Sequence, residues 1–207
     1  MMSKGYLLAI DAEIRDPEGL AALNERIQTM LRRDRGDILV RGGAIYPMHD
    51  GSVPPARITF LEFDSVDEAL ELFNDPELAE IREERRRYST PSVFVVEGVP
   101  NPPSPPTSDS TKGYYVVLDA AISDRPALEH LSQRLQAVQE ANGGFDLVRG
   151  GTIHSINDGF PVPERITIVQ FPSLADARIL MGVPEFVALR MERHQYADTH
   201  AFVVEGV

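Results

Sequence analysis

One 96-residue unit is written twice in this chain of 207 residues. Residues 4–99 return as residues 112–207 with a constant offset of 108 and no gap, and 40 of the 96 aligned positions are identical. A fixed period of this length indicates that each copy is a structural module. The sequence therefore predicts a first module over residues 1–99 and a second over residues 112–207, joined by a linker over residues 100–111.

The predicted linker is rich in proline, which favours an extended polyproline II path and opposes helix and strand. At ~3.1 Å per residue it reaches up to about 37 Å, enough to let one module swing across the face of the other. The modules can therefore pair within one chain, and a homodimer is the alternative.

The net charge of −12 argues against nucleic acid as a partner, because binding a phosphate backbone needs a basic face. The dense basic cluster at Arg85, Arg86 and Arg87 follows several glutamates, and we interpret it as a solvated helix face. We expect a cytosolic protein with no membrane partner, because no apolar run approaches ~20 residues and the chain has no cysteine.

Both copies show the same order of strand and helix patterns. Short β-prone runs open and close each copy, and two more flank an Asp-Gly pair that predicts a hairpin. Asp16 and Asp124 cap the first predicted helix, and Pro76 and Pro184 divide the second. The predicted strands cover residues 6–13, 38–46, 57–63 and 93–97 in the first copy and 114–121, 147–154, 165–171 and 201–205 in the second.

This β-α-β-β-α-β order predicts an α+β fold of two tandem ferredoxin-like modules, each a four-stranded antiparallel sheet with both helices on one side. The strands are apolar on both faces: Leu7 and Ala9 alternate with Leu8 and Ile10. A half-solvated sheet would alternate polar with apolar residues. We therefore expect the two sheets to pack face to face as a dimeric α/β barrel.

Several motifs together resemble the domain of unknown function 1330 family of the dimeric α/β-barrel superfamily. They are the opening strands GYLLAIDA and GYYVVLDA, LVRGG in both copies, RITFLEFDS and RITIVQFPS, the steps DPEL and VPEF, and the terminal VVEGV. The resemblance covers both copies over nearly their full length. It implies a fused version of a family that usually forms homodimers, whose superfamily includes cofactor-free monooxygenases, lactone isomerases, decarboxylase-like or dehydratase-like enzymes and haem-binding members.

Several charged residues are shared by both copies on predicted strands. A charge among apolar neighbours costs several kcal/mol unless it is paired, so an arginine-aspartate bridge inside each module is the economical explanation. The alternative is that an arginine reaches a barrel cavity and binds a substrate carboxylate or enolate. The shared residues are Asp11 with Asp119, Arg41 with Arg149, and Arg57 with Arg165.

Other polar residues differ between the copies and could form two unlike sites. Histidine titrates near neutral pH, so His154 and His49, at the mouth of the predicted central hairpin, are candidate general acids or bases. The alternative is a surface loop that tolerates these residues without using them. One candidate site has Tyr46, His49 and Glu62; the other has His154, Asn157 and Gln170, and His200 is a further candidate ligand-binding residue.

The sequence predicts neither a metal site nor a cofactor site, because it lacks the spacings typical of zinc, nucleotide and nucleophile motifs. The leading hypothesis is a small-molecule enzyme with cofactor-free acid-base chemistry, such as an isomerase, cyclase or monooxygenase, acting on a compact, partly apolar and anionic metabolite. The alternative is a non-catalytic ligand-binding or scaffold protein.

Overall fold

The computed structural model describes residues 3–31, 36–103, 110–156, 160 and 162–207. The chain divides into two compact units, and each combines most of one repeat with a short segment of the other. Unit 1 comprises Met1–Gly43, Pro55–Pro100 and Thr152–Val162; unit 2 comprises Ala44–Pro54, Asn101–Gly151 and Pro163–Val207. In the described part of the chain, no helix is long and apolar enough to cross a membrane.

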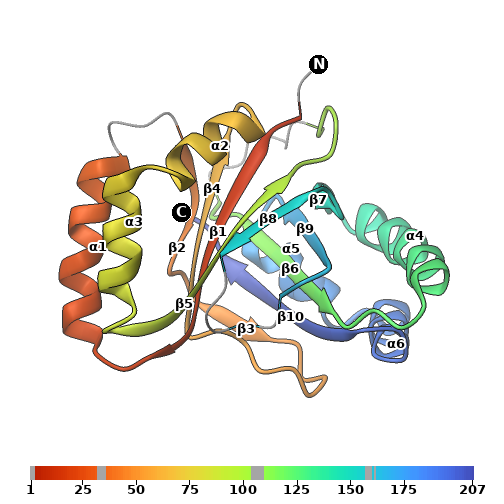
Figure 1. Ribbon diagram of the computed structural model, residues 1–207. Coiled ribbons are helices and arrows are strands. Elements are labelled where there is room, and N and C mark those ends of the chain that lie inside the picture. Colours follow the sequence, from red (N-terminus) through yellow and green to blue (C-terminus); the bar gives the residue numbers. More distant parts are fainter. Residues whose placement is uncertain (1–2, 32–35, 104–109, 157–159, 161) are drawn as a thin grey trace. The chain divides into compact units, whose positions relative to one another are not determined.

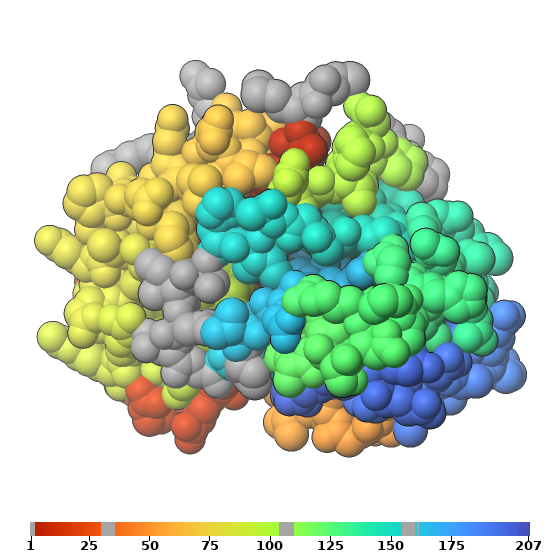
Figure 2. All heavy atoms as spheres, turned by 45° about the vertical axis from the view of Figure 1, so that its right-hand side comes forward, coloured from red at the N-terminus to blue at the C-terminus, as the bar shows by residue number. Residues whose placement is uncertain are grey.

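Unit 1 is an antiparallel sheet in the order β2-β4-β1-β5-β8, with helices α1, α2 and α3 (Figure 1). One of its two edge strands, β8, comes from the second repeat and pairs with β5. Turquoise atoms of this segment form part of the surface seen in Figure 2. The elements are β1 (Gly5–Ile14), α1 (Pro17–Leu31), β2 (Asp37–Arg41), β4 (Arg57–Phe63), α2 (Val66–Phe73), α3 (Pro76–Arg85), β5 (Ser89–Glu97) and β8 (Ile153–Ile156).

Unit 2 repeats this arrangement, with the order β3-β10-β6-β9-β7 and helices α4, α5 and α6. Its outermost strand β3 comes from the first repeat and pairs with β10. The elements are β3 (Ile45–Pro47), β6 (Gly113–Ala120), α4 (Arg125–Ala141), β7 (Phe145–Arg149), β9 (Arg165–Phe171), α5 (Leu174–Leu180), α6 (Pro184–Arg193) and β10 (Asp198–Glu205).

Helix starts follow the capping residues that the sequence offers. The side chains of Ser65 and Ser173 accept hydrogen bonds from the backbone N–H groups three residues on, and Asp124 does the same for α4. Each bond satisfies one of the N–H groups that a helix start leaves free, typically worth ~1 kcal/mol. Pro76 and Pro184 then open α3 and α6, as predicted.

The predicted strand over residues 38–46 is wrong in its length, and so is the prediction of four strands in each sheet. Residues 37–41 form β2, which pairs antiparallel with β4, as the predicted hairpin requires. The strand ends at Arg41 and the chain turns at Gly42, whose φ of 61° is in the left-handed region that glycine tolerates. The Gly42 N–H donates to the Ile58 carbonyl at 2.8 Å. Residues 45–47 then join the other repeat's last strand, so each sheet has five strands.

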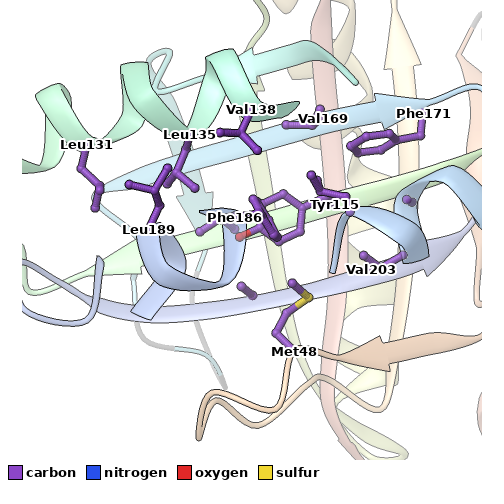
Figure 3. Close-up of a cluster of buried hydrophobic side chains, with 14 residues drawn as sticks. Met48, Tyr115, Leu131, Leu135, Val138, Val169, Phe171, Phe186, Leu189 and Val203 are labelled. Atoms are coloured by element: carbon purple, nitrogen blue, oxygen red, sulfur yellow. The ribbon is translucent and has the colours of Figure 1, made fainter. Parts of the chain in front are cut away.

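Each unit has a hydrophobic core on the helix side of its sheet. In unit 1 the core includes Leu7, Leu61 and Val95. In unit 2 it includes Tyr115 and Phe186, with Met48 from the first repeat (Figure 3). We call residues 44–54, which belong to unit 2, and residues 152–162, which belong to unit 1, the exchanged segments. Burying each such side chain contributes roughly 1.5–3 kcal/mol. Residues of the opposite faces are also buried, as the apolar strands predict: Tyr6, Leu8, Ile10, Phe60, Phe94, Tyr114, Val116, Ile168 and Phe202. Face-to-face pairing of the sheets stays a prediction.

Candidate functional site

A pocket lies in unit 1, lined by residues of the sheet and of helices α1, α2 and α3. Its volume is about 550 Å³ with its opening to solvent included. The described residues of its lining are mainly apolar and include no histidine or cysteine that could bind a metal or haem iron. The residues are Leu7, Ala9, Asn24, Ile27, Thr59, Leu61, Leu72, Leu78, Ile81, Arg82, Arg85 and Val93.

Arg85 in the pocket wall is part of a buried ion pair. Its Nε donates to Asp11 Oδ1 at 2.9 Å and its Nη2 donates to Asp11 Oδ2 at 2.6 Å. The hydroxyl of Ser89 donates to the same carboxylate at 2.7 Å. Arg85 is 6% exposed and Asp11 is fully buried, so the two charges neutralise each other where water cannot screen them.

Arg82 is the second arginine in the described lining of the pocket. It is half-buried, its Nη1 donates to the Phe73 carbonyl at 2.5 Å, and its guanidinium lies 4.8 Å from the centre of the Phe73 ring. Burial and the nearby Arg86 lower the pKa of Arg82 below its usual range. A hydrogen-bond acceptor or anion beside Arg82 would be stabilised, because the cation is partly removed from water there.

Unit 2 contains the counterpart ion pair between Asp119 and Arg193. Arg193 Nε donates to Asp119 Oδ1 at 2.8 Å, and Thr199 donates its hydroxyl to the same oxygen at 2.8 Å. Burial opposes the charge of Arg193, but the attraction and hydrogen bonds of Asp119 outweigh it and raise the Arg193 pKa. An arginine-aspartate bridge therefore lies inside each unit.

Asp50, from the exchanged segment, joins a second buried charge cluster in unit 2. Its side chain is 0% exposed, accepts from the Ser52 hydroxyl at 2.6 Å and lies 3.3 Å from Arg190 Nη1 and 3.4 Å from His194 Nε2. Burial alone would raise the pKa of Asp50, but the Ser52 hydrogen bonds, Arg190 and His194 lower it overall. Arg190 also donates to the carbonyl of Met48 at 2.5 Å.

A more polar pocket of about 480 Å³, opening included, lies at the surface of unit 2. Ion pairs cross it, between Arg125 and Glu164 and between Arg165 and Glu129. The hydrogen bond from Arg165 lowers the pKa of Glu129. Because these charges already satisfy one another, the surface pocket is a weaker candidate for a binding site than the pocket of unit 1.

Three of the predicted candidates, His154, Tyr46 and His49, lie on the exchanged segments. His154 is in β8 of unit 1, half-buried, opposite Val95 of β5. Tyr46 is in β3 of unit 2, and the Arg178 guanidinium lies 4.7 Å from its ring centre. His49 follows it, exposed, with a φ of 58°. The pocket lining includes none of these residues.

The predicted arginines have separate environments. Arg41 is exposed at the end of β2, whereas Arg57 lies opposite Asp11 in the sheet. Burial, and then the nearby Arg85, lower the pKa of Arg57. Arg149 Nε donates to Asp146 at 2.7 Å, and Arg165 donates to Glu129 at 2.5 Å.

The remaining candidates are divided between the units. Glu62 in unit 1 accepts from the Tyr6 hydroxyl at 2.9 Å and pairs with Lys4. Gln170 is buried in β9 of unit 2, and His200 Nε2 lies 4.0 Å from Asp198 Oδ1. Asn157 lies outside the described residues.

The arginines of the second helical pieces are not among the predicted site residues. The solvated face predicted for Arg85 is wrong, because Arg85 bonds to the buried Asp11. Leu78, Ile81 and Arg85 recur at helical spacing, so Arg85 lies on the apolar stripe of α3. That spacing, together with an identical arginine at position 193, was the available signal.

Histidine, cysteine and acidic side chains do not form a group of three or more that could hold a metal ion anywhere in the described ranges.

Comparisons with known proteins give a family and a fold. The model of a domain of unknown function, DUF1330, matches residues 4–99 and 112–207. Curated proteins give no match. A solved anthrone oxidase-like protein is 11% identical, with a TM-score of 0.59 over 100% of this chain and 92% of that one. Chlorite dismutase from Candidatus Nitrospira defluvii in complex with imidazole is 10% identical, with a TM-score of 0.54 over 100% and 92%. At these identities the likeness is one of fold.

Proposed function

The chain belongs, through both of its repeats, to the domain of unknown function 1330 family, and we propose that its unit 1 binds a compact small molecule. The ligand is largely apolar and carries one hydrogen-bond acceptor, such as a carboxylate or carbonyl. The observation that carries this proposal is the pocket beneath helices α1, α2 and α3, with apolar walls and a guanidinium at Arg82.

The pocket walls define the class of ligand. Leu7, Leu61 and Leu72 present apolar surface, and removing a ligand's apolar area from water there stabilises the complex by roughly 25 cal/mol per Å². The charged residues of the described lining are Arg82 and Arg85, and Asp11 neutralises Arg85. A cationic ligand would therefore meet a side chain of like charge at Arg82, while an acceptor can bond to it.

An enzyme is the second candidate function, and the position of His154 favours it. His154 is opposite Val95, and Val95 belongs to the same core cluster as the pocket residues Leu61 and Leu72. His154 lies outside the pocket lining, so this function requires a ligand that extends past the lining residues to the edge strand β8. Isomerisation, cyclisation or cofactor-free oxygenation remains the predicted chemistry, with His49, Tyr46, Arg149 and Arg41 as the further predicted catalytic residues.

The module boundaries, face-to-face pairing within one chain or in a homodimer, and a cytosolic location stay predictions beside this proposal.

Two fluorescent probes of matched size test the proposed site. We expect 2-naphthoate to bind at least tenfold more tightly than 2-(aminomethyl)naphthalene, which is cationic at pH 7. The substitution Arg82→Gln should remove most of that preference. The exposed Arg26→Gln is the matched control, because Arg26 pairs with Glu84 outside the pocket lining.

A pocket-filling variant supplies the decisive outcome. Leu7→Tyr with Leu78→Phe introduces the residues found at positions 115 and 186 and should abolish binding of both probes. Unchanged binding in this variant would overturn the proposal. For the enzymatic alternative, His154→Ala should abolish turnover of a compound that binds in the pocket, with His49→Ala measured beside it.

A further inference from the structure

Each residue lining the pocket of unit 1 has a counterpart 108 positions later in unit 2. Leu7, Ala9 and Leu78 correspond to the larger residues Tyr115, Val117 and Phe186. Asn24, Leu61 and Val93 correspond to the smaller residues Ser132, Val169 and Ala201. Arg82 and Arg85 keep their identities as Arg190 and Arg193. The counterpart region therefore keeps both arginines, and it has two aromatic rings, Tyr115 and Phe186, where unit 1 has Leu7 and Leu78.

Burial shows how these differences change the region. In unit 1 Ala9, Asn24, Ile27, Thr59 and Arg82 are half-buried, as expected for the wall of an open pocket. In unit 2 every counterpart of the pocket lining is buried.

The two larger residues of unit 2 contact each other directly. The rings of Tyr115 and Phe186 meet edge to face, with 5.3 Å between centroids and 74° between planes (Figure 3). Figure 3 shows them between the sheet and the helices, among Leu135, Leu189 and Val203. The two rings that meet in unit 2 thus stand at the sequence positions where unit 1 has Leu7 and Leu78.

We propose that Tyr115 and Phe186 fill the space that unit 1 leaves open, so that the chain binds one ligand of this class, in unit 1. Leu7 and Leu78 are then the residues that keep the site open and set the depth available to the ligand. The ligand class in this proposal rests on the proposed function. The statement that unit 2 has no open pocket at these rings does not rest on the proposed function, because it is argued from the packing of unit 2 alone.

The counterpart of Arg82 has a different task in unit 2. Arg190 is 5% exposed, donates to the Met48 carbonyl and lies beside the Asp50 carboxylate, both from the exchanged segment. Its charge is already neutralised and holds that segment in place. The two repeats have therefore divided their roles: unit 1 keeps a binding pocket, and unit 2 uses the same positions for packing and for anchoring the exchanged segment.

The proposal is tested by replacing the two rings of unit 2 with smaller side chains and looking for a new cavity there. In Tyr115→Leu with Phe186→Leu, a crystal under xenon pressure should show xenon in unit 2 at the place left by the two rings, where the unaltered protein shows none. Phe186→Leu alone is the milder variant if the double variant fails to fold. An unaltered protein that already takes xenon at Tyr115 and Phe186, or a folded variant that takes none, would overturn the proposal.

Probe stoichiometry separates this proposal from the proposed function. The unaltered chain should bind one 2-naphthoate, and Leu7→Tyr with Leu78→Phe should bind none. Two probes bound to the unaltered chain would contradict the closed unit 2. If the unaltered chain binds no naphthoate at all, the proposed function fails, while the xenon result still decides whether unit 2 is closed.

Discussion

At the scale of single residues, the buried aspartates are the most constrained feature of both units. Asp11 and Asp119 are fully buried, and each takes two bonds from an arginine and one from a hydroxyl. The hydroxyls come from positions that the repeat does not match, since Ser89 corresponds to Ala197 and Thr199 corresponds to Pro91. The two copies thus complete the same carboxylate shell by different routes.

Removing one partner of the unit 1 pair should be costly. Asp11→Ala leaves the Arg85 guanidinium buried without its counter-charge, and we expect a loss of about 3–5 kcal/mol in the free energy of unfolding, measured in urea. The double substitution Asp11→Leu with Arg85→Met should cost far less, because no charge stays buried. A loss below about 1 kcal/mol in Asp11→Ala would show that the pair is not desolvated.

The hydroxyl of Tyr115 predicts a stability effect at alkaline pH. Burial raises the pKa of Tyr115 to about 12, against 10.0 for a free phenol. The unfolded chain therefore loses this proton first, and the stabilising contribution of the neutral phenol falls as the pH rises from 10 to 12, by up to ~3 kcal/mol. Tyr115→Phe should lose less stability over this range than the unaltered protein, as followed by urea unfolding.

The same substitution should have little effect at neutral pH. Among the described residues the Tyr115 hydroxyl has no hydrogen-bond partner, so removing it should change the free energy of unfolding by less than about 1 kcal/mol. A loss well above this value would reveal a bonded hydroxyl and contradict the packing role given to the ring.

Residue patterns could predict that Asp11 and Asp119 need partners, but not which partners. Arg57 is the partner that the sequence offers for Asp11, and it lies opposite Asp11 in the sheet. The bond goes to Arg85 because the packing of α3 on the sheet brings that arginine to the carboxylate, and helix packing is a tertiary effect that single-sequence spacing does not contain.

At the scale of elements, the exchanged strands are the main departure from the sequence-based prediction. The Asp50-Gly51 pair is a genuine turn signal, and Ser52 does bond back to Asp50. The strand before it nevertheless pairs with β10 and not with its neighbour in sequence. Because the repeats share their patterns, a strand of one copy suits the sheet edge of the other equally well, and local sequence cannot distinguish the two pairings.

Asp50 should hold the exchanged strand β3 in a pH-dependent way. Asp50→Asn weakens the interaction with Arg190, and we expect a loss of about 2–3 kcal/mol near neutral pH. The pKa of Asp50 is lowered in the folded protein, so its contribution is complete above the unfolded value near ~4 and is lost as the pH falls through the folded value. The difference between variant and unaltered protein should therefore shrink below about pH 4.

The exposed Asp198→Asn is the control for this measurement, because its carboxylate is 63% exposed. Equal losses of unfolding free energy in Asp50→Asn and Asp198→Asn would show that Asp50 does not anchor β3. A loss in Asp50→Asn that is as large at pH 3 as at neutral pH would show the same.

At the scale of the whole molecule, the duplication predicts the fold class and the exchange determines how the repeats are built into units. Two ferredoxin-like repeats followed directly from the order of strands and helices. The candidate site did not, because the pocket of unit 1 depends on Leu7 and Leu78 being smaller than Tyr115 and Phe186. The size difference is visible in the sequence, but its effect on a pocket is not, because the sequence does not show that both positions lie side by side between the sheet and the helices.

The first repeat expressed alone, as residues 1–103, should form a dimer. Its segment 44–54 lacks the strand β10 that it pairs with, and its β5 lacks β8. Two copies can satisfy both needs by exchanging strands, since an open sheet edge is a template for pairing. Sedimentation analysis should give twice the mass of the fragment, whereas a stable folded monomer would show that the exchange is dispensable.

The most direct test of the account is a crystal structure of the unaltered protein with 2-naphthoate. The account predicts the naphthyl ring against Leu7, Leu61 and Leu72 of unit 1, with the carboxylate beside Arg82 and no probe between Tyr115 and Phe186. A probe bound in unit 2 at those rings, or bound elsewhere while the pocket of unit 1 stays free of it, would contradict it.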